Sequence, residues 1–182
     1  MASRNVRDIR TSGFPGGRPP FITTHAARAA RTRQYALVIA EVERLVNGLH
    51  ASGVLEKPTP RETPDRYMVQ TGQVALSIAW LRGPTDLVTD GTLLVIVWRG
   101  TIAPRSPGDE TRTSVVPVRT ATSAWEDIVS VAAESEALWR WCSANVGADG
   151  VSSVELARTV VRQLERAARG ADADTRDRAA LH

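Results

Sequence analysis

The chain has one lysine, one cysteine and three histidines among its 182 residues, and each scarcity excludes a class of site. A single cysteine, Cys142, cannot form an internal disulfide, and it excludes zinc and iron–sulfur sites that need several cysteines. Lys57 stands alone against 22 arginines, which indicates a general compositional preference for arginine. The abundance of arginine is therefore weak evidence for function by itself.

Histidine is too rare to support the common catalytic arrangements. His25 and His50 have no second histidine, cysteine or carboxylate cluster at metal-ligand spacing, and no motif marks a nucleophile beside either of them. No glycine-rich loop joins a strand to a helix in the way a phosphate cradle requires. The sequence therefore predicts no catalytic residue, no metal site and no cofactor, and we expect a protein that is not an enzyme.

Long hydrophobic runs are also missing. The longest, residues 93–98, is far too short to span a bilayer, and no apolar stretch follows the first residues as a secretory signal would require. We expect no membrane association and a cytoplasmic location. Hydrophobic residues make up 42% and charged residues 24%, which is ordinary for a globular domain.

Positive charge concentrates at the start of the chain. Residues 1–34 hold seven arginines and one acidic residue, Asp8, a net charge of +6, so the rest carries −3 of the chain's net +3. Frequent glycine and proline disfavour helix and strand in this segment. We expect a flexible Arg/Gly/Pro-rich arm over residues 1–24, a single α+β domain over 25–170, and a frayed charged tail over 171–182.

One helix should precede the sheet. Thr24 is a suitable N-cap, and the helix should run to about Leu49. Apolar residues at helical spacing form one stripe: Val38, Val42, Leu45, Val46 and Leu49. Residues 25–33 lack such a stripe and are expected to project or fray. Glycine and three prolines mark 52–64 as a linker.

β-Branched runs bounded by glycine or proline predict strands over residues 67–71, 74–81 and 92–102. Gly72 is either a tight turn or a bulge. Residues 92–102 are apolar on both faces, as expected of a central strand covered on two sides. A fourth strand, 114–120, contains Pro117 and should lie at an edge.

The preferred register of the hairpin 74–102 pairs Trp80 with Leu94 and keeps Trp80 and Trp98 on one face. A slip of one residue instead opposes Trp80 to Leu93 or Val95, since side chains alternate between the two faces of a strand. The sequence leaves this choice open.

Two capping-box patterns predict helices after the sheet. Ser123-Ala124-Trp125-Glu126 should open a helix that reaches about residue 145, and Ser152-Ser153-Val154-Glu155 one that stops before Gly170. On a helix Trp139 and Trp141 would lie about 200° apart, so at least one tryptophan should face solvent or a partner. The expected fold is α+β: an N-terminal helix, a three- to four-stranded antiparallel β-meander, and two C-terminal helices packed on the sheet.

These features favour a non-enzymatic protein-interaction or assembly subunit that self-associates and uses its arginine-rich arm, a sheet edge or a helix face to bind partners. Two alternatives remain open: a nucleic-acid-binding module with sequence-independent phosphate contacts, and a small-molecule-binding domain or enzyme with a site between sheet and helices. The candidate partner-binding residues are Arg4, Arg7, Arg10, Arg18, Arg28, Arg31, Arg33, Trp125, Trp141, Arg158, Arg162 and Arg166.

Overall fold

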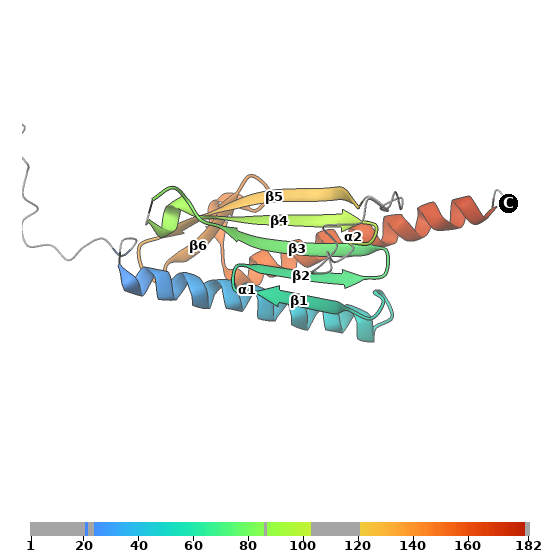
Figure 1. The fold of residues 1–182 in the computed structure, drawn as a ribbon, viewed down its shortest axis with the longest axis horizontal. Helices are drawn as coiled ribbons and strands as arrows, with labels where there is room; N and C mark the ends of the chain where they lie inside the picture. The colour runs from blue at the N-terminus through green and yellow to red at the C-terminus, as the bar shows by residue number, and fades with distance from the viewer. Residues whose placement is uncertain (1–20, 22–23, 86, 103–120, 181–182) are drawn as a thin grey trace, which may run out of the picture.

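The computed structural model describes residues 21, 24–85, 87–102 and 121–180, and for residues 148 and 171–180 it describes the backbone alone. These residues form two long helices, seven strands and one turn of 3-10 helix, η2 (Figure 1). In chain order the elements are α1 (His25–Ala51), β1 (Thr59–Thr63), β2 (Arg66–Thr71), β3 (Val74–Leu81), η2 (Val88–Asp90), β4 (Thr92–Arg99), β5 (Thr122–Ala133), β6 (Trp139–Ser143), β7 (Gly147–Val151) and α2 (Ser153–Ala180).

The seven strands form one antiparallel sheet in which each strand pairs with its neighbours in the chain. Both helices cover the same face, here called the inner face, and the opposite one is the outer face (Figure 1). Because neighbouring strands of the sheet alternate in direction, the first strand, β1, and the seventh, β7, run in the same direction. α1 leads into β1 and α2 follows β7, and both helices run in the opposite direction, so they are parallel to each other. Ser153 accordingly contacts Gln34, and Arg158, farther along α2, lies near Glu41, farther along α1.

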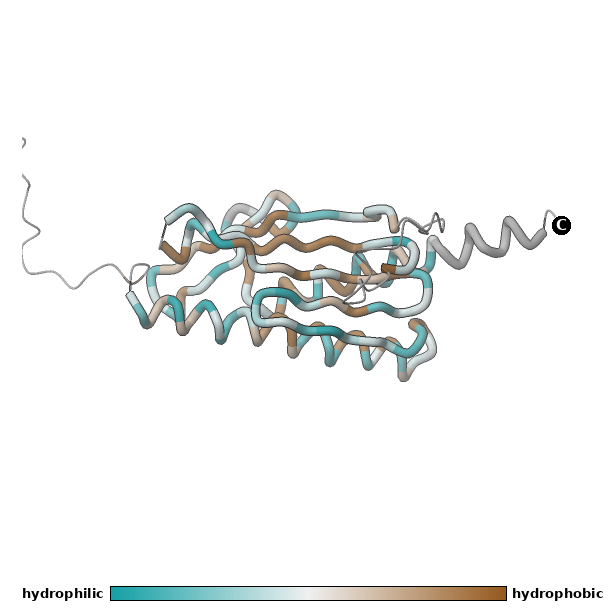
Figure 2. The backbone as a smooth tube through the Cα atoms, in the orientation of Figure 1, coloured by the Kyte–Doolittle hydropathy of each residue, from teal (hydrophilic) through white to brown (hydrophobic). Residues whose placement is uncertain are grey.

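The core lies between the two helices and the inner face. Figure 2 shows the middle strands as the most hydrophobic part of the backbone, whereas β1 is polar. The largest fully buried side chains are Trp141, Tyr67, Leu76, Ile78, Leu93, Leu156, Leu164, Val38, Val42, Val46, Val69 and Val74. They come from both helices and four strands, so the domain has one continuous core.

α1 confirms the predicted helix and its apolar stripe. The Thr24 side chain accepts a hydrogen bond from the Ala27 N–H at 3.2 Å, as an N-cap should. The expectation that residues 25–33 project or fray is wrong, because Ala27 and Ala30 are fully buried. Alanine contributes no stripe of large side chains, but its small size allows close packing of a helix against its neighbours.

The hairpin β2–β3 settles the role of Gly72, which has a φ of +56° in the tight turn and is not a bulge. The preferred register of the next hairpin is wrong by one residue: Trp80 is paired with Leu93, and Leu94 with Ala79. Trp80 therefore lies on the inner face and Trp98 on the outer face, where the Trp98 Nε1–H donates to Ser77 Oγ at 3.0 Å.

The predicted helix from Ser123 to about residue 145 is wrong. Residues 122–133 form β5, which pairs with the central strand β4, and the chain then forms the hairpin β6–β7. Asp127, Val129 and Val131 are buried, whereas the residues between them are exposed, which is the two-residue period of a strand. The β-branched residues and the pairing with β4 outweigh the local capping pattern.

The second capping box is confirmed. The Ser152 N–H donates to Glu155 Oε2 at 2.9 Å, and the Glu155 N–H donates to Ser152 Oγ at 3.3 Å. The expected stop before Gly170 is wrong, since α2 continues to Ala180, whereas the frayed charged tail over 171–182 stays a prediction. A glycine inside a helix costs only about 1 kcal/mol relative to alanine, which the surrounding helix can offset.

The fold class is therefore α+β as expected, but with more strands and fewer helices. Seven strands replace three or four, and one C-terminal helix replaces two in the described part of the chain. β1 forms within the predicted linker 52–64 and lies at an edge of the sheet. The strand predicted over 114–120 falls outside the described residues.

The two serines of the capping patterns provide a direct test of this assignment. We expect Ser152→Ala to lower the free energy of unfolding by about 1 kcal/mol, because it removes the N-cap of α2. Ser123→Ala changes an exposed strand position and should stay within about 0.5 kcal/mol of the parent. Urea denaturation followed by circular dichroism measures both, and equal losses would contradict the structure.

Candidate functional site

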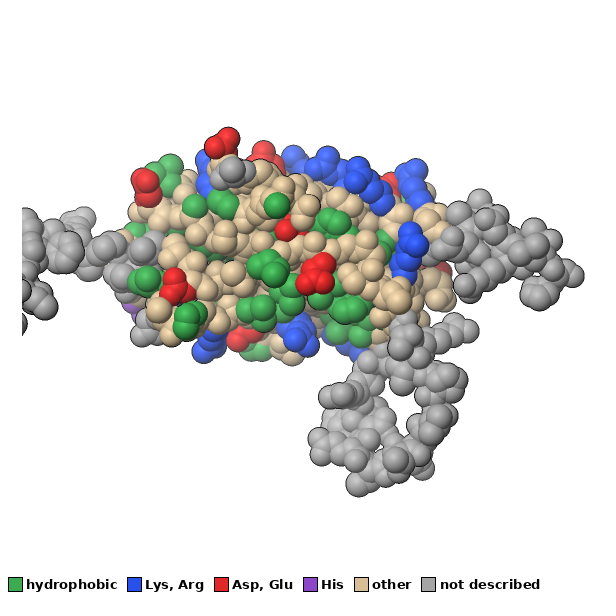
Figure 3. Space-filling model, turned by 90° about the horizontal axis from the view of Figure 1, so that it is seen from above, with side chains coloured by type: hydrophobic (Ala, Val, Ile, Leu, Met, Phe, Trp, Pro, Cys, Tyr) green, Lys and Arg blue, Asp and Glu red, His purple; other side chains and the backbone are tan. Residues whose placement is uncertain are grey.

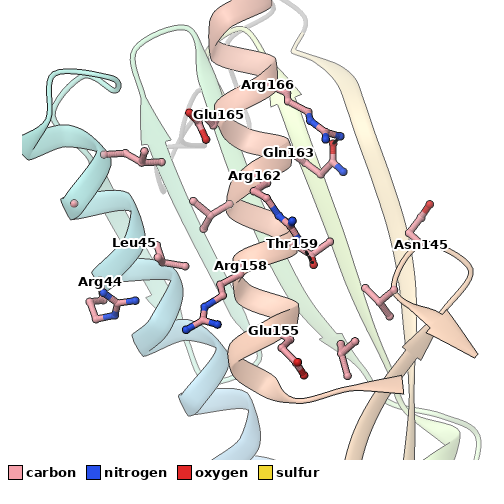
Figure 4. A pocket seen from close by; sticks show the side chains of 15 residues that line it. Arg44, Leu45, Asn145, Glu155, Arg158, Thr159, Arg162, Gln163, Glu165 and Arg166 are labelled. Carbon is pink, nitrogen blue, oxygen red and sulfur yellow. Dashed lines mark hydrogen bonds between the residues drawn. The ribbon is translucent and has the colours of Figure 1, made fainter. Parts of the chain in front are cut away.

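A large hollow in the described part of the chain lies along the exposed side of α2 and has a volume of about 990 Å³. The second half of α1 forms one wall, and the β6–β7 hairpin forms the other (Figure 4). We call this feature the α2 groove. Arg44, Leu45, Gly48 and Leu49 of α1 line it together with Asn145, Val146 and Val151 of the hairpin, and α2 contributes residues from Glu155 to Arg166.

Three of the predicted arginines meet in the α2 groove. Arg158, Arg162 and Arg166 recur every four residues, so they follow one side of the helix. Their guanidinium groups are only lightly engaged: Arg162 donates to Thr159 Oγ1 at 3.1 Å and Arg166 to Gln163 Oε1 at 3.5 Å. All three side chains are exposed, so they are accessible to a ligand in the groove.

A fourth arginine, Arg44, reaches the α2 groove from α1 and was not singled out by the sequence. It donates two hydrogen bonds of 2.7 Å to the carboxylate of Glu41, and these lower the pKa of Glu41. The Nε of Arg158 lies 3.9 Å from the same carboxylate. Only the packing of α1 against α2 brings these cations together, and no sequence spacing reports that contact.

Acidic side chains balance part of this charge. Glu155 and Glu165 line the α2 groove and Glu41 pairs with Arg44 beside it, so four arginines face three glutamates. Hydrogen bonds from the backbone N–H and the hydroxyl of Ser152 lower the pKa of Glu155, which stays ionised as the capping residue of α2. The groove thus keeps an excess of positive charge.

The base of the α2 groove is apolar. Leu45 and Leu49 at the foot of the α1 wall and Val146 at the foot of the hairpin wall are half-buried and pack on the core, and Val161 of α2 is almost fully buried. An apolar base with a cationic rim suits a segment that has apolar side chains on one side and carboxylates on the other. Apolar side chains and carboxylates on opposite sides of one segment are typical of an amphipathic helix of a protein.

The other predicted arginines of the described chain occupy different positions. Arg28 and Arg31 line a second hollow of about 590 Å³ near Trp80. The Arg31 guanidinium lies 5.2 Å from the Trp80 ring centroid and 3.7 Å from Asp65. Arg33 donates hydrogen bonds of 2.7 and 2.6 Å to both carboxylate oxygens of Glu136. Arg31 and Arg33 therefore link α1 to the sheet and its loops.

Arg4, Arg7, Arg10 and Arg18 fall outside the described residues. Most of the predicted arm therefore lies outside the described residues as well.

The two candidate tryptophans lie on strands. Trp141 is fully buried and makes edge-to-face contacts with Trp80 and Trp139, with ring centroids 6.3 and 5.6 Å apart. Its Nε1–H donates to Ser153 Oγ at 2.9 Å, so it fastens the start of α2 to the sheet. It is a core residue in this fold and does not face a partner. Trp125 is half-buried on the inner face of β5.

Metal-ligating side chains do not cluster in the described part of the chain. No set of three histidine, cysteine or carboxylate side chains there could hold a metal ion. Neither long helix, over its described residues, has a stretch apolar enough to cross a membrane. No protein-family model, no curated protein and no solved structure matches this chain.

Proposed function

We propose that the protein is a non-enzymatic interaction subunit that binds an acidic, amphipathic segment of a partner protein in the α2 groove. The observation that supports this most is the set of Arg158, Arg162 and Arg166, exposed beside an apolar base in a groove of about 990 Å³. The groove runs along α2 between α1 and the β6–β7 hairpin, so a helix with leucine on one side and glutamate on the other is complementary to it in shape and charge.

A protein segment fits better than a nucleic acid. A phosphate backbone has no group that gains from contact with Leu45, Leu49 and Val146. Glu155 and Glu165 would also lie close to the phosphates and repel them. A partner helix places apolar side chains on the base and can pair its own cations with these glutamates.

Binding can be measured with a labelled amphipathic peptide of about 20 residues, about 30 Å long as a helix, that carries leucine on one side and glutamate on the other. The double variant Arg162→Gln/Arg166→Gln should weaken binding about two- to thirtyfold, because each exposed ion pair contributes about 0.2 to 1 kcal/mol. Fluorescence anisotropy at fixed salt gives the dissociation constants.

The double variant Arg33→Gln/Arg82→Gln is the matched control. It removes the same charge from two exposed side chains outside the α2 groove and should leave peptide binding unchanged. A short labelled DNA duplex tests the alternative. Tighter binding to the duplex than to the peptide, with a steep dependence on salt, would overturn the proposal in favour of a nucleic-acid-binding module.

A further inference from the structure

The outer face of the sheet carries no second layer in the described part of the chain, since both helices lie on the inner face (Figure 1). Its central strand nevertheless has the composition of one buried on both sides. Leu93, Val95 and Val97 of β4 are buried beneath the helices. The alternate side chains of the strand are half-buried on the outer face: Leu94, Ile96 and Trp98.

Neighbouring strands extend this apolar surface. The register places Met68 of β2, Ser77 and Ala79 of β3, and Ile128 of β5 beside the β4 side chains. Ile128 is 60% exposed and Leu81 44% exposed, both high values for large aliphatic side chains. Figure 3 looks onto the molecule from above, from the side of β5, and hydrophobic side chains gather near the middle of that view, next to acidic ones. Contiguous exposed apolar patches of this kind mark interaction surfaces.

The charges on the outer face have opposite signs on its two sides. Arg61 of β1 and Arg66 of β2 lie on one side, and Glu126 of β5 lies on the other. Arg61, Met68, Ser77, Ile96 and Glu126 form one row across the sheet, with Arg66 in the next row. Arg140 of β6 lies opposite Ala132, beyond the start of β4, and is outside these rows.

A second copy of the same chain is complementary to this arrangement. Two copies can pack face to face about a twofold axis that runs parallel to the strands, above the space between β3 and β4. In this arrangement β5 of one copy lies over β2 of the other, and each row of side chains in one copy faces the same row in the other. Glu126 of each copy then lies over β2 of the other copy, on the side of the sheet that carries Arg61 and Arg66. Arg61 is on the next strand, β1, so its sideways offset from Glu126 is about one strand spacing of 4.8 Å. The apolar centre meets itself across the axis.

The surface is also large enough. Five strands about 4.8 Å apart and about 27 Å long give a face of about 600 Å² per copy, or about 1,200 Å² in total. This exceeds the roughly 1,000 Å² that a specific interface must bury. Burial in a sheet-on-sheet contact also explains why β4 is apolar on both sides.

We infer that two copies of this chain associate through the outer faces of their sheets, with Glu126 of each copy paired to Arg61 and Arg66 of the other. The inference goes beyond the proposed function and does not rest on it, because the α2 groove lies on the helix side of the sheet and remains exposed in this dimer.

Sedimentation equilibrium of the full chain tests the inference. We expect a mass twice the 19.7 kDa of the chain at high micromolar concentration. Ile128→Lys should shift the population to monomer, because it buries two unpaired cations at the interface. The control Leu37→Lys adds the same charge at a 50% exposed position of α1 and should leave the dimer intact.

A charge exchange tests the twofold pairing itself. Arg66→Glu and Glu126→Arg should each raise the dimer dissociation constant at least about tenfold, since each places like charges opposite one another. The double variant should return to within about threefold of the parent. Additive losses in the double variant would overturn the arrangement.

A monomer across the whole concentration range would overturn the inference as well. If a segment of the same chain covered the outer face, Ile128→Lys would lower the melting temperature without any change of mass. Loss of peptide binding in the α2 groove leaves this test unaffected, so the two proposals fail separately.

Discussion

Trp141→Ala is expected to lower the free energy of unfolding by about 3 to 5 kcal/mol, a large part of the stability of a domain this size. The ring is fully buried at the junction of β6, β3 and the start of α2, where it contacts Trp80 and Trp139. Removal leaves a cavity and also leaves the Ser153 hydroxyl without the indole donor. Urea denaturation with fluorescence and circular dichroism gives the value.

Trp125→Ala provides the comparison. Trp125 is half-buried on the inner face of β5 and has less apolar area to lose, so the cost should be under about 2 kcal/mol. A helix over residues 123–145 would place Trp139 and Trp141 on opposite sides and leave one of them exposed. Equal and small losses for Trp141→Ala and Trp125→Ala would therefore contradict the strand assignment.

Gly91→Ala is the second substitution with a large expected effect, a loss of about 1 to 3 kcal/mol from overpacking. Gly91 has a φ of −79°, which suits any residue, so the cost is steric. A Cβ at this position would overlap the Trp80 ring, which is held between Arg31 and Trp141 and cannot move aside easily. Thermal unfolding of the variant measures the loss.

Gly48→Ala should have the opposite sign. Gly48 lies inside α1, and a Cβ there meets nothing within 4 Å. Alanine should stabilise the helix by about 0.5 to 1 kcal/mol, because glycine loses more backbone entropy on folding. The same change thus gives opposite results at two glycines, and a loss at Gly48 would show that the α1 packing is different.

The two capping patterns show where local sequence is insufficient. Ser123 to Glu126 and Ser152 to Glu155 share the same spacing, yet the first lies in β5 and the second opens α2. The difference lies in the following residues: Leu156, Val160 and Leu164 recur at helical spacing, whereas the buried side chains after Ser123 alternate. A four-residue signal cannot decide between them.

The candidate site was predictable only in part. The spacing of Arg158, Arg162 and Arg166 on one side of a helix follows from the sequence. The nearness of Arg44 and the apolar base from Leu45 and Leu49 depend on how α1 lies against α2. Sequence separations of more than a hundred residues leave no local signal for such contacts.

The sequence by itself determined α1, the extended segments that form β2 and β3, the apolar strand β4 and the start of α2, because capping residues, β-branched runs and apolar periodicity act over a few residues. Only the tertiary structure decided which face each side chain occupies. The connection between β3 and β4 sets a register one residue away from the preferred one, and side chains alternate along a strand, so Trp98 lies on the outer face. The same packing brought Arg44 to the arginines of α2, since only the contact between the two helices joins them.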